Sequence, residues 1–264
     1  MTKAGKETVS SRIRTHLETL RLTKIGEILE EALSTATAEN TPAPLLLEQL
    51  LSAEAAALIE RRVERRIRGA KLLERKLLAD FDFQFQTGVD QRQILTLAEM
   101  DFVARRQSII FGGHSGTGKS HLAQALLLIA CSKNLRCLYT TAADMLRHLK
   151  SGLVDDTLEV KLKRYLAPEL LLIDEVGFDR IEQEDTYPAA LFFKVIDGRY
   201  AKKSTMMTTN LDFKELGDYL GDPIVTTAIV DRLVHHAVII NIEGPSWRMH
   251  QSELLNKPHT DEAV

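Results

Sequence analysis

The residues from Gly113 to Ser120 have the types and spacing that suit the binding of a polyphosphate. They read GHSGTGKS, which matches the pattern G-x-x-x-x-G-K-[ST] in full. An apolar stretch precedes them and an amphipathic stretch follows, so the loop would join a strand to a helix. Glycines let the backbone curl until successive N–H groups point at phosphate oxygens. We therefore expect a nucleotide to be held here by Gly113, His114, Ser115, Gly116, Thr117, Gly118, Lys119, Ser120 and His121.

Two side chains of this loop would supply charge and a metal ligand. The Lys119 ammonium would neutralise the β- and γ-phosphates, and the Ser120 hydroxyl would bind Mg²⁺. The alternative is a glycine-rich turn that matches the pattern by chance. The strand and helix signals on either side favour the nucleotide, so ATP and Mg²⁺ are the expected cofactors.

A pair of acidic residues, Asp174 and Glu175, ends the apolar segment LLLIDE. In an open parallel sheet, ligands lie at the carboxyl ends of the strands. Asp174 would hold Mg²⁺ through water. Glu175 would polarise the attacking water, which indicates that ATP is hydrolysed rather than stored. The alternative is that the two acids only cap the loop that follows.

A third segment, TMMTTN, reads as a strand that ends in the amide of Asn210. If this strand lies between the strands of the phosphate loop and of the acidic pair, Asn210 reaches the γ-phosphate and its attacking water. The alternative is a turn asparagine before Leu211 and Asp212.

The elements that must position these residues alternate between strand and helix. Such alternation predicts a parallel sheet covered by helices on both faces. Expected helices span residues 119–133, 185–202 and 224–235, and expected strands span 108–111, 136–140, 170–173, 205–209 and 237–242.

The N-terminal region reads differently, as two amphipathic helices. Apolar residues recur at helical spacing from Ile13 to Leu33, and the proline-containing stretch 36–44 then breaks the pattern. A second helix is expected over residues 45–79, followed by an extended linker over 81–89. We therefore divide the chain into a helical domain (1–80) for partner or DNA contacts, an ATPase domain (81–256) and a polar tail (257–264).

Composition excludes several other classes of protein. The chain has 264 residues, a net charge of −3 and 6% aromatic residues, so an aromatic-rich platform for single strands is not expected. Its two cysteines, Cys131 and Cys137, form no C-x-x-C pair, which argues against a zinc site or a disulfide scaffold. No apolar run approaches the roughly 20 residues of a membrane helix, and no signal-peptide core is evident, so a cytoplasmic location is expected.

Five phrases in register resemble one family. The segments TGKSHLAQAL, LLLIDEVGFDR, GRYAKKSTMMTTN, AIVDRLVHHA and GPSWR are similar to those of IstB-like insertion-sequence transposition helpers, which are AAA+ ATPases related to the DnaC helicase loaders. The resemblance covers roughly Leu78 to Leu255. It implies an α/β three-layer sandwich with a five-stranded parallel sheet of order 5-1-4-3-2, preceded by a small all-α domain. The residues after Ile242 are too few for the helical lid of many AAA+ proteins.

The same resemblance implies partners and a mechanism. It implies a homo-oligomer that assembles on duplex DNA with ATP, largely independently of sequence, and that recruits and stimulates a transposase. A replicative helicase loader of the DnaC type is the main alternative, separable by the partner that co-purifies. A small-molecule phosphotransferase and a non-hydrolysing nucleotide-gated scaffold are further alternatives, against which the missing lid arginines and Glu175 respectively argue.

Arginines complete the expected site. In AAA+ proteins an arginine of a neighbouring subunit reaches the γ-phosphate, and the resemblance assigns this role to Arg232. The alternative for Arg232 is a surface ion pair with Asp231, which would contribute little. Arg248 could partly replace the missing lid arginine, and Arg199 is a weaker candidate for action between subunits.

Three basic clusters are candidates for contact with DNA phosphates, which would make binding sensitive to salt. The alternative for the first cluster is a solvated helix face paired with nearby glutamates. The candidates from the residues themselves are Arg61, Arg62, Arg65 and Arg66 on the long N-terminal helix, and Lys202 and Lys203. The resemblance alone adds Lys161, Lys163 and Arg164 before the acidic-pair strand, for which the alternative is an ordinary amphipathic helix.

Overall fold

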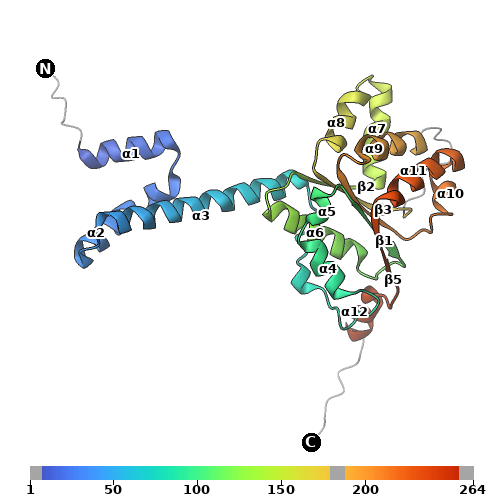
Figure 1. Cartoon of the computed structure of the whole chain (residues 1–264), viewed down its shortest axis with the longest axis horizontal. Helices are drawn as coiled ribbons and strands as arrows, with labels where there is room; N and C mark the ends of the chain where they lie inside the picture. The colour runs from blue at the N-terminus through green and yellow to red at the C-terminus, as the bar shows by residue number, and fades with distance from the viewer. Residues whose placement is uncertain (1–7, 179–187, 256–264) are drawn as a thin grey trace, which may run out of the picture. The chain divides into compact units, whose positions relative to one another are not determined.

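The computed structural model describes residues 8–178 and 188–255 (Figure 1). The chain forms two compact units that divide between Arg65 and Arg66, earlier than the boundary expected after Asp80. The expected polar tail, residues 257–264, lies outside the described residues.

The N-terminal unit is helical, as the periodicity predicts. It contains α1 (Val9–Leu20), α2 (Thr23–Glu39) and most of α3 (Ala43–Ala70). The first of the two helices that we predicted is therefore divided in two, because the left-handed backbone of Arg21 (φ 58°) ends α1. Its core is small and centres on Ile25, Leu29 and Leu50. A buried carboxylate, Glu54, accepts hydrogen bonds from the Ile25 N–H (3.0 Å) and from Arg61 (2.6 Å). These bonds outweigh the opposing effect of burial and lower the pKa of Glu54.

The helix α3 ends earlier than expected. We predicted a helix to residue 79, but α3 stops at Ala70, and Lys71 has a left-handed backbone (φ 57°). Ala70 is fully buried in the core of the second unit, so the chain must turn there, and Leu72 and Leu78 then pack against the same core. The apolar spacing beyond residue 70 therefore reflects core contacts of a loop and of the short helix η1 (Leu78–Asp80).

The second unit is built on a five-stranded parallel sheet. The strands are β1 (Ser108–Gly113), β2 (Cys137–Thr141), β3 (Leu170–Val176), β4 (Ser204–Thr209) and β5 (Ala237–Ile242). Their order is β2-β3-β4-β1-β5, which confirms the predicted arrangement and places β4 between β1 and β3.

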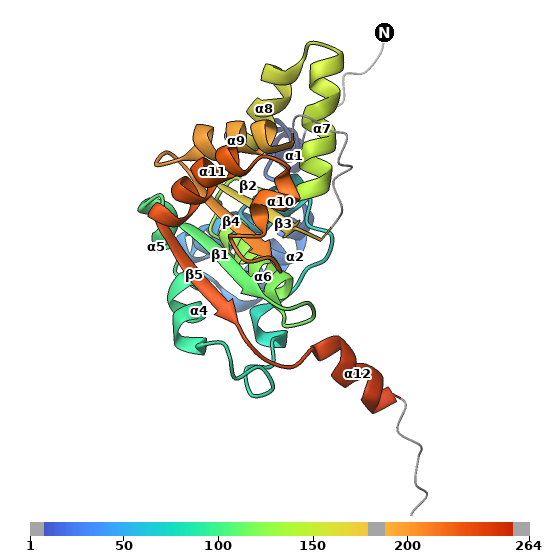
Figure 2. The same cartoon turned by 90° about the vertical axis from the view of Figure 1, so that its right-hand side faces the viewer.

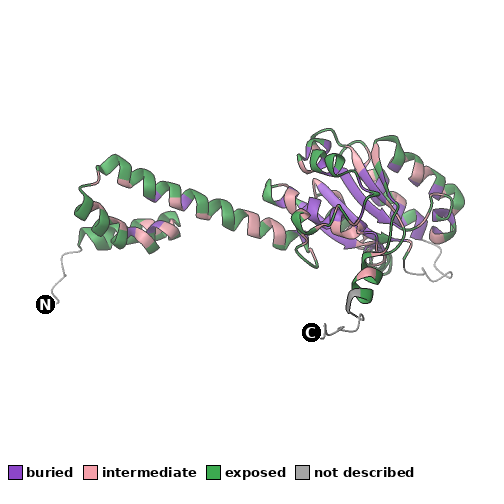
Figure 3. Cartoon of the chain, turned by 90° about the horizontal axis from the view of Figure 1, so that it is seen from below, coloured by how far each residue is buried: buried purple, intermediate pink, exposed green. Residues whose placement is uncertain are grey.

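Alternation along the strands creates two apolar layers. Ile109 and Phe111 of β1 face one cluster, while Ile110 faces the other. Because side chains of a strand alternate between faces, a strand buried on both sides reads as a continuous apolar run. Buried residues accordingly concentrate in the sheet (Figure 3).

Helices cover both faces of the sheet (Figure 2). The first layer contains α4 (Gln91–Ala98), α5 (Asp101–Ala104) and α6 (Lys119–Ser132). The second contains α7 (Ala142–Val154), α8 (Leu158–Leu166), α9 (Pro188–Arg199), α10 (Leu216–Leu220) and α11 (Pro223–His235). Within the described residues, α12 (Trp247–Leu255) is the element that follows β5.

Residues 81–89 are not the extended linker that we predicted. The Asp82 carboxylate accepts hydrogen bonds from the N–H groups of Gln84 and Phe85, both at 2.9 Å, so the segment turns on itself. Gln86 is buried and donates to the carbonyls of Thr117 and Pro245. The segment is thereby fixed against the phosphate loop.

Arg199 is a structural residue, contrary to our expectation that it could act between subunits. Its side chain is 1% exposed. Its guanidinium donates to the Tyr165 and Pro168 carbonyls (2.7 and 3.0 Å), to the Thr205 hydroxyl (2.9 Å) and to the Ser204 carbonyl. Burial lowers the pKa of Arg199 to about 9, which leaves it charged at neutral pH.

We predict that Arg199→Met lowers the free energy of unfolding by about 2–5 kcal/mol, because several buried acceptors lose their donor at once. Urea unfolding followed by circular dichroism measures this change. Lys202→Met, an exposed neighbour just beyond the same helix, is the matched control and should leave the midpoint unchanged. Equal midpoints for the two variants would contradict the structural role of Arg199.

Candidate nucleotide site

The phosphate loop joins β1 to α6, as the motif predicts. Gly116 and Gly118 have positive φ angles of 82° and 93°, which side-chain-bearing residues rarely adopt. A Cβ atom on Gly116 would lie 2.1 Å from the Ser246 Oγ, and one on Gly118 would lie 2.5 Å from the Phe81 ring. The loop therefore needs glycine at both positions, for backbone conformation and for close packing.

Lys119 is fixed at this loop. Its Nζ donates to the carbonyls of Gly113 and His114, both at 2.6 Å, and the residue is 8% exposed. Burial lowers the pKa of Lys119, the nearby Arg248 charge lowers it further, and Asp174 opposes both effects. An ammonium in this environment is poorly compensated and suited to an anion.

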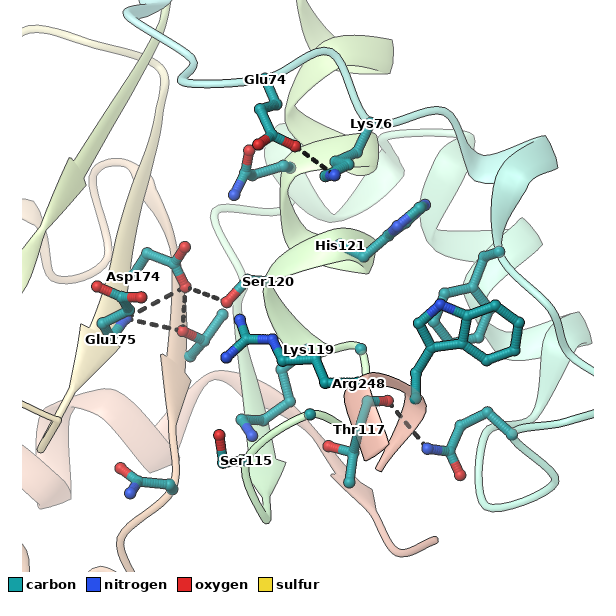
Figure 4. Close-up of a pocket in the computed structure, with 18 of the residues that line it drawn as sticks. Glu74, Lys76, Ser115, Thr117, Lys119, Ser120, His121, Asp174, Glu175 and Arg248 are labelled. Carbon is teal, nitrogen blue, oxygen red and sulfur yellow. Dashed lines mark hydrogen bonds and ion pairs between the residues drawn. The ribbon is translucent and has the colours of Figure 1, made fainter. Parts of the chain in front are cut away.

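The Asp174 carboxylate is the centre of a hydroxyl network (Figure 4). Ser120 Oγ donates to its Oδ1 at 2.8 Å, and the Thr208 hydroxyl donates to the same oxygen. Tyr139 donates to Oδ2 at 3.2 Å. Burial and the Asp174 charge raise the pKa of Tyr139, so its hydroxyl stays a donor. The carboxylate and hydroxyl oxygens of Asp174 and Ser120 are hard ligands that suit Mg²⁺.

Glu175 leaves the sheet at the next residue. Its φ of 60° is left-handed, and the pairing of β3 with β4 shifts register between Ile173 and Val176. Its N–H donates to the Thr208 Oγ1 at 3.0 Å. Non-glycine residues pay about 1–3 kcal/mol for such a backbone, and strain of this kind is concentrated at functional sites. The result is an exposed carboxylate on the wall of the pocket.

Predicted site residues from the ends of β3 and β4, from the phosphate loop with the start of α6, and from α12 line one cavity of about 420 Å³. Asn210 follows β4 and lines this cavity. Its expected role requires β4 to lie between β1 and β3, as it does in this sheet. Gly113 and His114 contribute their carbonyls to Lys119 but are not among its lining residues. The predicted residues that line it are Ser115, Gly116, Thr117, Gly118, Lys119, Ser120, His121, Asp174, Glu175, Asn210 and Arg248.

Sequence reasoning missed one wall of the cavity. Phe81, Phe85 and Gln86 line it from the segment that we predicted to be a linker. His121 belongs to this wall, because its Nε2 lies 2.8 Å from the Leu77 carbonyl and its ring meets Phe81 edge-on. The alternation of phenylalanines at 81, 83 and 85 was the available signal for packing. Tyr139 and Thr208, also missed, read as ordinary strand residues.

The C-terminal helix α12 brings Arg248 to the site. The Trp247 N–H donates to the Gly116 carbonyl at 3.0 Å, and the Trp247 ring packs edge-on against Phe85 at 4.9 Å. Arg248 then extends toward Lys119 and Ser120 (Figure 4). Arg248 therefore lies in the cavity where we expect the nucleotide.

Arg232 lies elsewhere, on α11, and is not among the residues that line this cavity. It does not form the ion pair with Asp231 that we considered. Its Nε donates instead to Asp197 of α9 at 2.7 Å.

The basic candidates differ in how available they are. Arg61 pairs with Glu54, Arg66 donates to Asn134 at 3.1 Å, and Lys161 pairs with Asp155 at 2.8 Å. Lys203 is half-buried. Solvent-exposed side chains among the predicted residues are Arg62, Arg65, Lys163, Arg164 and Lys202, besides the paired Arg61.

The sheet and the phosphate loop together define a P-loop protein with the AAA+ fold. Two solved structures have this fold. The replication initiator DnaA bound to AMPPCP and single-stranded DNA matches with a TM-score of 0.54 and 22% identity over 70% of this chain and 56% of that one. DnaI matches with a TM-score of 0.52 and 22% identity over 65% of this chain and 90% of that one.

Comparison of sequences identifies the family. Residues 15–254 match the model of the IstB-like ATP binding protein, and the chain belongs to this family. An insertion sequence IS232 putative ATP-binding protein of Bacillus thuringiensis is 33% identical over 90% of this chain and 94% of its own length. An IS5376 putative ATP-binding protein of Geobacillus stearothermophilus is 32% identical over 96% of this chain and 100% of its own. None of the described helices is long and apolar enough to cross a membrane.

We predict that Lys119→Ala weakens nucleotide binding by about 10- to 100-fold, the cost of a lost charge-assisted hydrogen bond. Titration with a fluorescent ATP analogue measures the dissociation constant. Lys133→Ala, just beyond the other end of α6, is the control and should bind normally. Unchanged affinity in Lys119→Ala would mean that the cavity is not the nucleotide site.

Proposed function

We propose that this protein is an ATPase that assists DNA transposition by assembling on duplex DNA and engaging a transposase. The observation that carries the proposal is the convergence of Lys119, the Ser120–Asp174 pair and Glu175 on one cavity. Membership of the IstB-like family and the insertion-sequence relatives support the transposition context.

Hydrolysis would follow from the positions of these groups. Lys119 would move from the loop carbonyls to the β- and γ-phosphates, and Ser120 and Asp174 would hold Mg²⁺. The ion would neutralise charge on the phosphates. Glu175 would accept a proton from the water that attacks the γ-phosphorus, with Asn210 orienting that water. ADP and phosphate are the products.

The wall that contains Phe81, Phe85 and Gln86 would receive the base of the nucleotide. Aromatic rings stack on bases, and His121 of this wall lies on the other side of Ser120 from Asp174 and Glu175 (Figure 4). Trp247 packs against Phe85, so α12 would respond to occupancy of both the base and the phosphate ends.

Assembly would complete the site. Arg232 lines no part of the cavity of its own chain, which fits action on the nucleotide of a neighbouring subunit. An arginine that stabilises transition-state charge in this way increases the rate by about 10³- to 10⁵-fold. The assembly would be a homo-oligomer in which each ATP site is shared.

Duplex DNA would be bound through backbone phosphates. The exposed candidates Lys163, Arg164 and Lys202 are the best placed to do so, because their charged ends are exposed and form no ion pair with another described residue. Arg62 and Arg65 would add charge from the helical region. The relatives named as insertion-sequence proteins favour transposition over helicase loading. The likeness to DnaI, at 22% identity, supports the fold alone.

We predict that Glu175→Gln reduces ATP turnover by about 10²-fold or more while leaving nucleotide binding intact, because the general base is lost but the phosphate contacts remain. Phosphate release and analogue binding measure the two quantities separately. Glu169→Gln is the control, because this partly exposed glutamate directly precedes the same strand. Unchanged turnover in Glu175→Gln would refute the role of Glu175.

Particle size and ATP turnover, measured with and without non-specific duplex DNA, test the proposal as a whole. We expect large ATP-dependent particles on DNA that dissociate as salt rises, since phosphate contacts release counterions. Lys163→Ala with Arg164→Ala should weaken this association. A monomer indifferent to duplex DNA, or co-purification with a ring helicase instead of a transposase, would overturn the proposal.

A further inference from the structure

Arg232 is held by three contacts on the face formed by α9 and α11. Its Nε donates to the Asp197 Oδ1 at 2.7 Å, and its Nη1 donates to the Ala228 carbonyl at 3.1 Å. Its guanidinium lies over the ring of Phe193, 4.7 Å from the centroid. Its side chain is 29% exposed, so the group is oriented by the protein but not enclosed.

These contacts occupy the Nε and Nη1 donors of the guanidinium and leave the Nη2 donors. Arginine has donors on a rigid planar fork. Asp197 engages Nε and Ala228 engages Nη1, while no hydrogen bond from Nη2 joins it to the described residues. Held at these two donors and covered on one face by Phe193, the planar group has a restricted orientation for its remaining donors.

The two helices that bring these groups together are themselves rigidly joined. Phe192 and Ile196 of α9 pack with Ile229 and Leu233 of α11 in one buried cluster. One turn further along, Tyr200 and His235 repeat the pairing, with the Tyr200 hydroxyl 2.6 Å from His235 Nδ1. The Asp197–Arg232 bond therefore lies between a packed core and a second side-chain pair, on helices that lie side by side (Figure 2).

We propose that Asp197 is a positioning residue that holds Arg232, with Phe193 beneath it, in the orientation needed to reach the nucleotide of a neighbouring subunit. This inference rests on the proposed role of Arg232 between subunits. Asp197 touches no reacting atom. It restricts the arginine to one orientation before assembly, so that less conformational freedom is lost when the shared site forms.

A purely stabilising role for the pair accounts poorly for this geometry. Ion pairs at this exposure contribute little to folding, because solvent screens them. Arg147 and Asp144 form a pair of the same length, 2.7 Å, on the exposed face of α7. Within the described part of the chain, Arg147 has no ring contact and no hydrogen bond to a carbonyl that would orient it, so this pair is a matched comparison for the charge and the distance.

The first experiment compares Asp197→Ala with Asp144→Ala in the full chain. We expect Asp197→Ala to lower the kcat for ATP by about tenfold, as a misdirected catalytic group does, with unchanged nucleotide affinity and particle size. Asp144→Ala should leave all three unchanged. Asp197→Asn, which keeps the shape and a hydrogen-bond acceptor, should lose less and provides a folded variant should the alanine form be unstable.

Combining variants tests whether Asp197 acts through Arg232. Arg232→Ala should lose far more turnover than Asp197→Ala, and the double variant should lose no more than Arg232→Ala, because residues that act as one unit are not additive. A mixture of Lys119→Ala and Asp197→Ala chains should recover turnover. In such a mixture, an Asp197→Ala chain, whose Lys119 is intact, can lie next to a Lys119→Ala chain, whose Arg232–Asp197 pair is intact.

The possible outcomes separate the two proposals. Full turnover in Arg232→Ala would overturn the role of Arg232 between subunits and this inference with it. Loss in Arg232→Ala but normal kcat in both Asp197 variants would overturn the positioning role alone. A double variant markedly worse than Arg232→Ala, or failure of the mixture to recover, would show that Asp197 acts by some other route.

Discussion

The buried charge of Asp174 is the constraint around which the nucleotide-binding unit is arranged. A carboxylate that is 2% exposed must have hydrogen-bond donors, or its burial would cost several kcal/mol. It receives them from Ser120 at the start of α6, Tyr139 of β2 and Thr208 of β4. One acid thus connects three strands and the phosphate loop, and any change in register of these strands would remove at least one donor.

The same constraint explains the backbone conformation of the next residue, Glu175. Thr208 accepts the N–H of Glu175 while donating to Asp174, so the backbone at Glu175 is fixed from β4 as well as from its own strand. The register shift and the left-handed φ at this point follow from directing two consecutive acids differently. Asp174 is directed into the hydroxyl network, and Glu175 toward the open part of the cavity. The strain is tolerated because the hydroxyl network over-determines the local backbone.

Local sequence patterns were sufficient to predict the core of this site. The loop, the acidic pair and the amide each end or follow an apolar strand, and parallel strands present their carboxyl ends at one edge. The strand order came from the family resemblance, because nothing in the alternation itself fixes which strands are neighbours. The wall formed by residues 81–86 could not be predicted, since its contacts with Thr117 and Pro245 join parts of the chain far apart in sequence.

Charged residues were the least predictable for the same reason. Arg199 and Arg232 both lie near the ends of amphipathic helices, and their sequence surroundings do not distinguish them. Arg199 is enclosed by carbonyls supplied by α8, by the loop before β3 and by β4, whereas Arg232 meets a carboxylate on a neighbouring helix and stays partly open. Whether a cation is structural or available depends on which distant backbone oxygens surround it, and helix periodicity contains no such information.

Two cations in the cavity, Lys119 and Arg248, would link the position of α12 to the presence of an anion there. Lys119 and Arg248 are close enough that the arginine lowers the pKa of the lysine. Their repulsion is unfavourable in the absence of an anion, and a polyphosphate between them would turn it into attraction for both. Because α12 is also tied to Gly116 and Phe85, its position relative to the loop would depend on the same charge. The first turn of α12 is fixed to the phosphate loop, so a single arginine would be enough to couple this helix to an anion in the cavity.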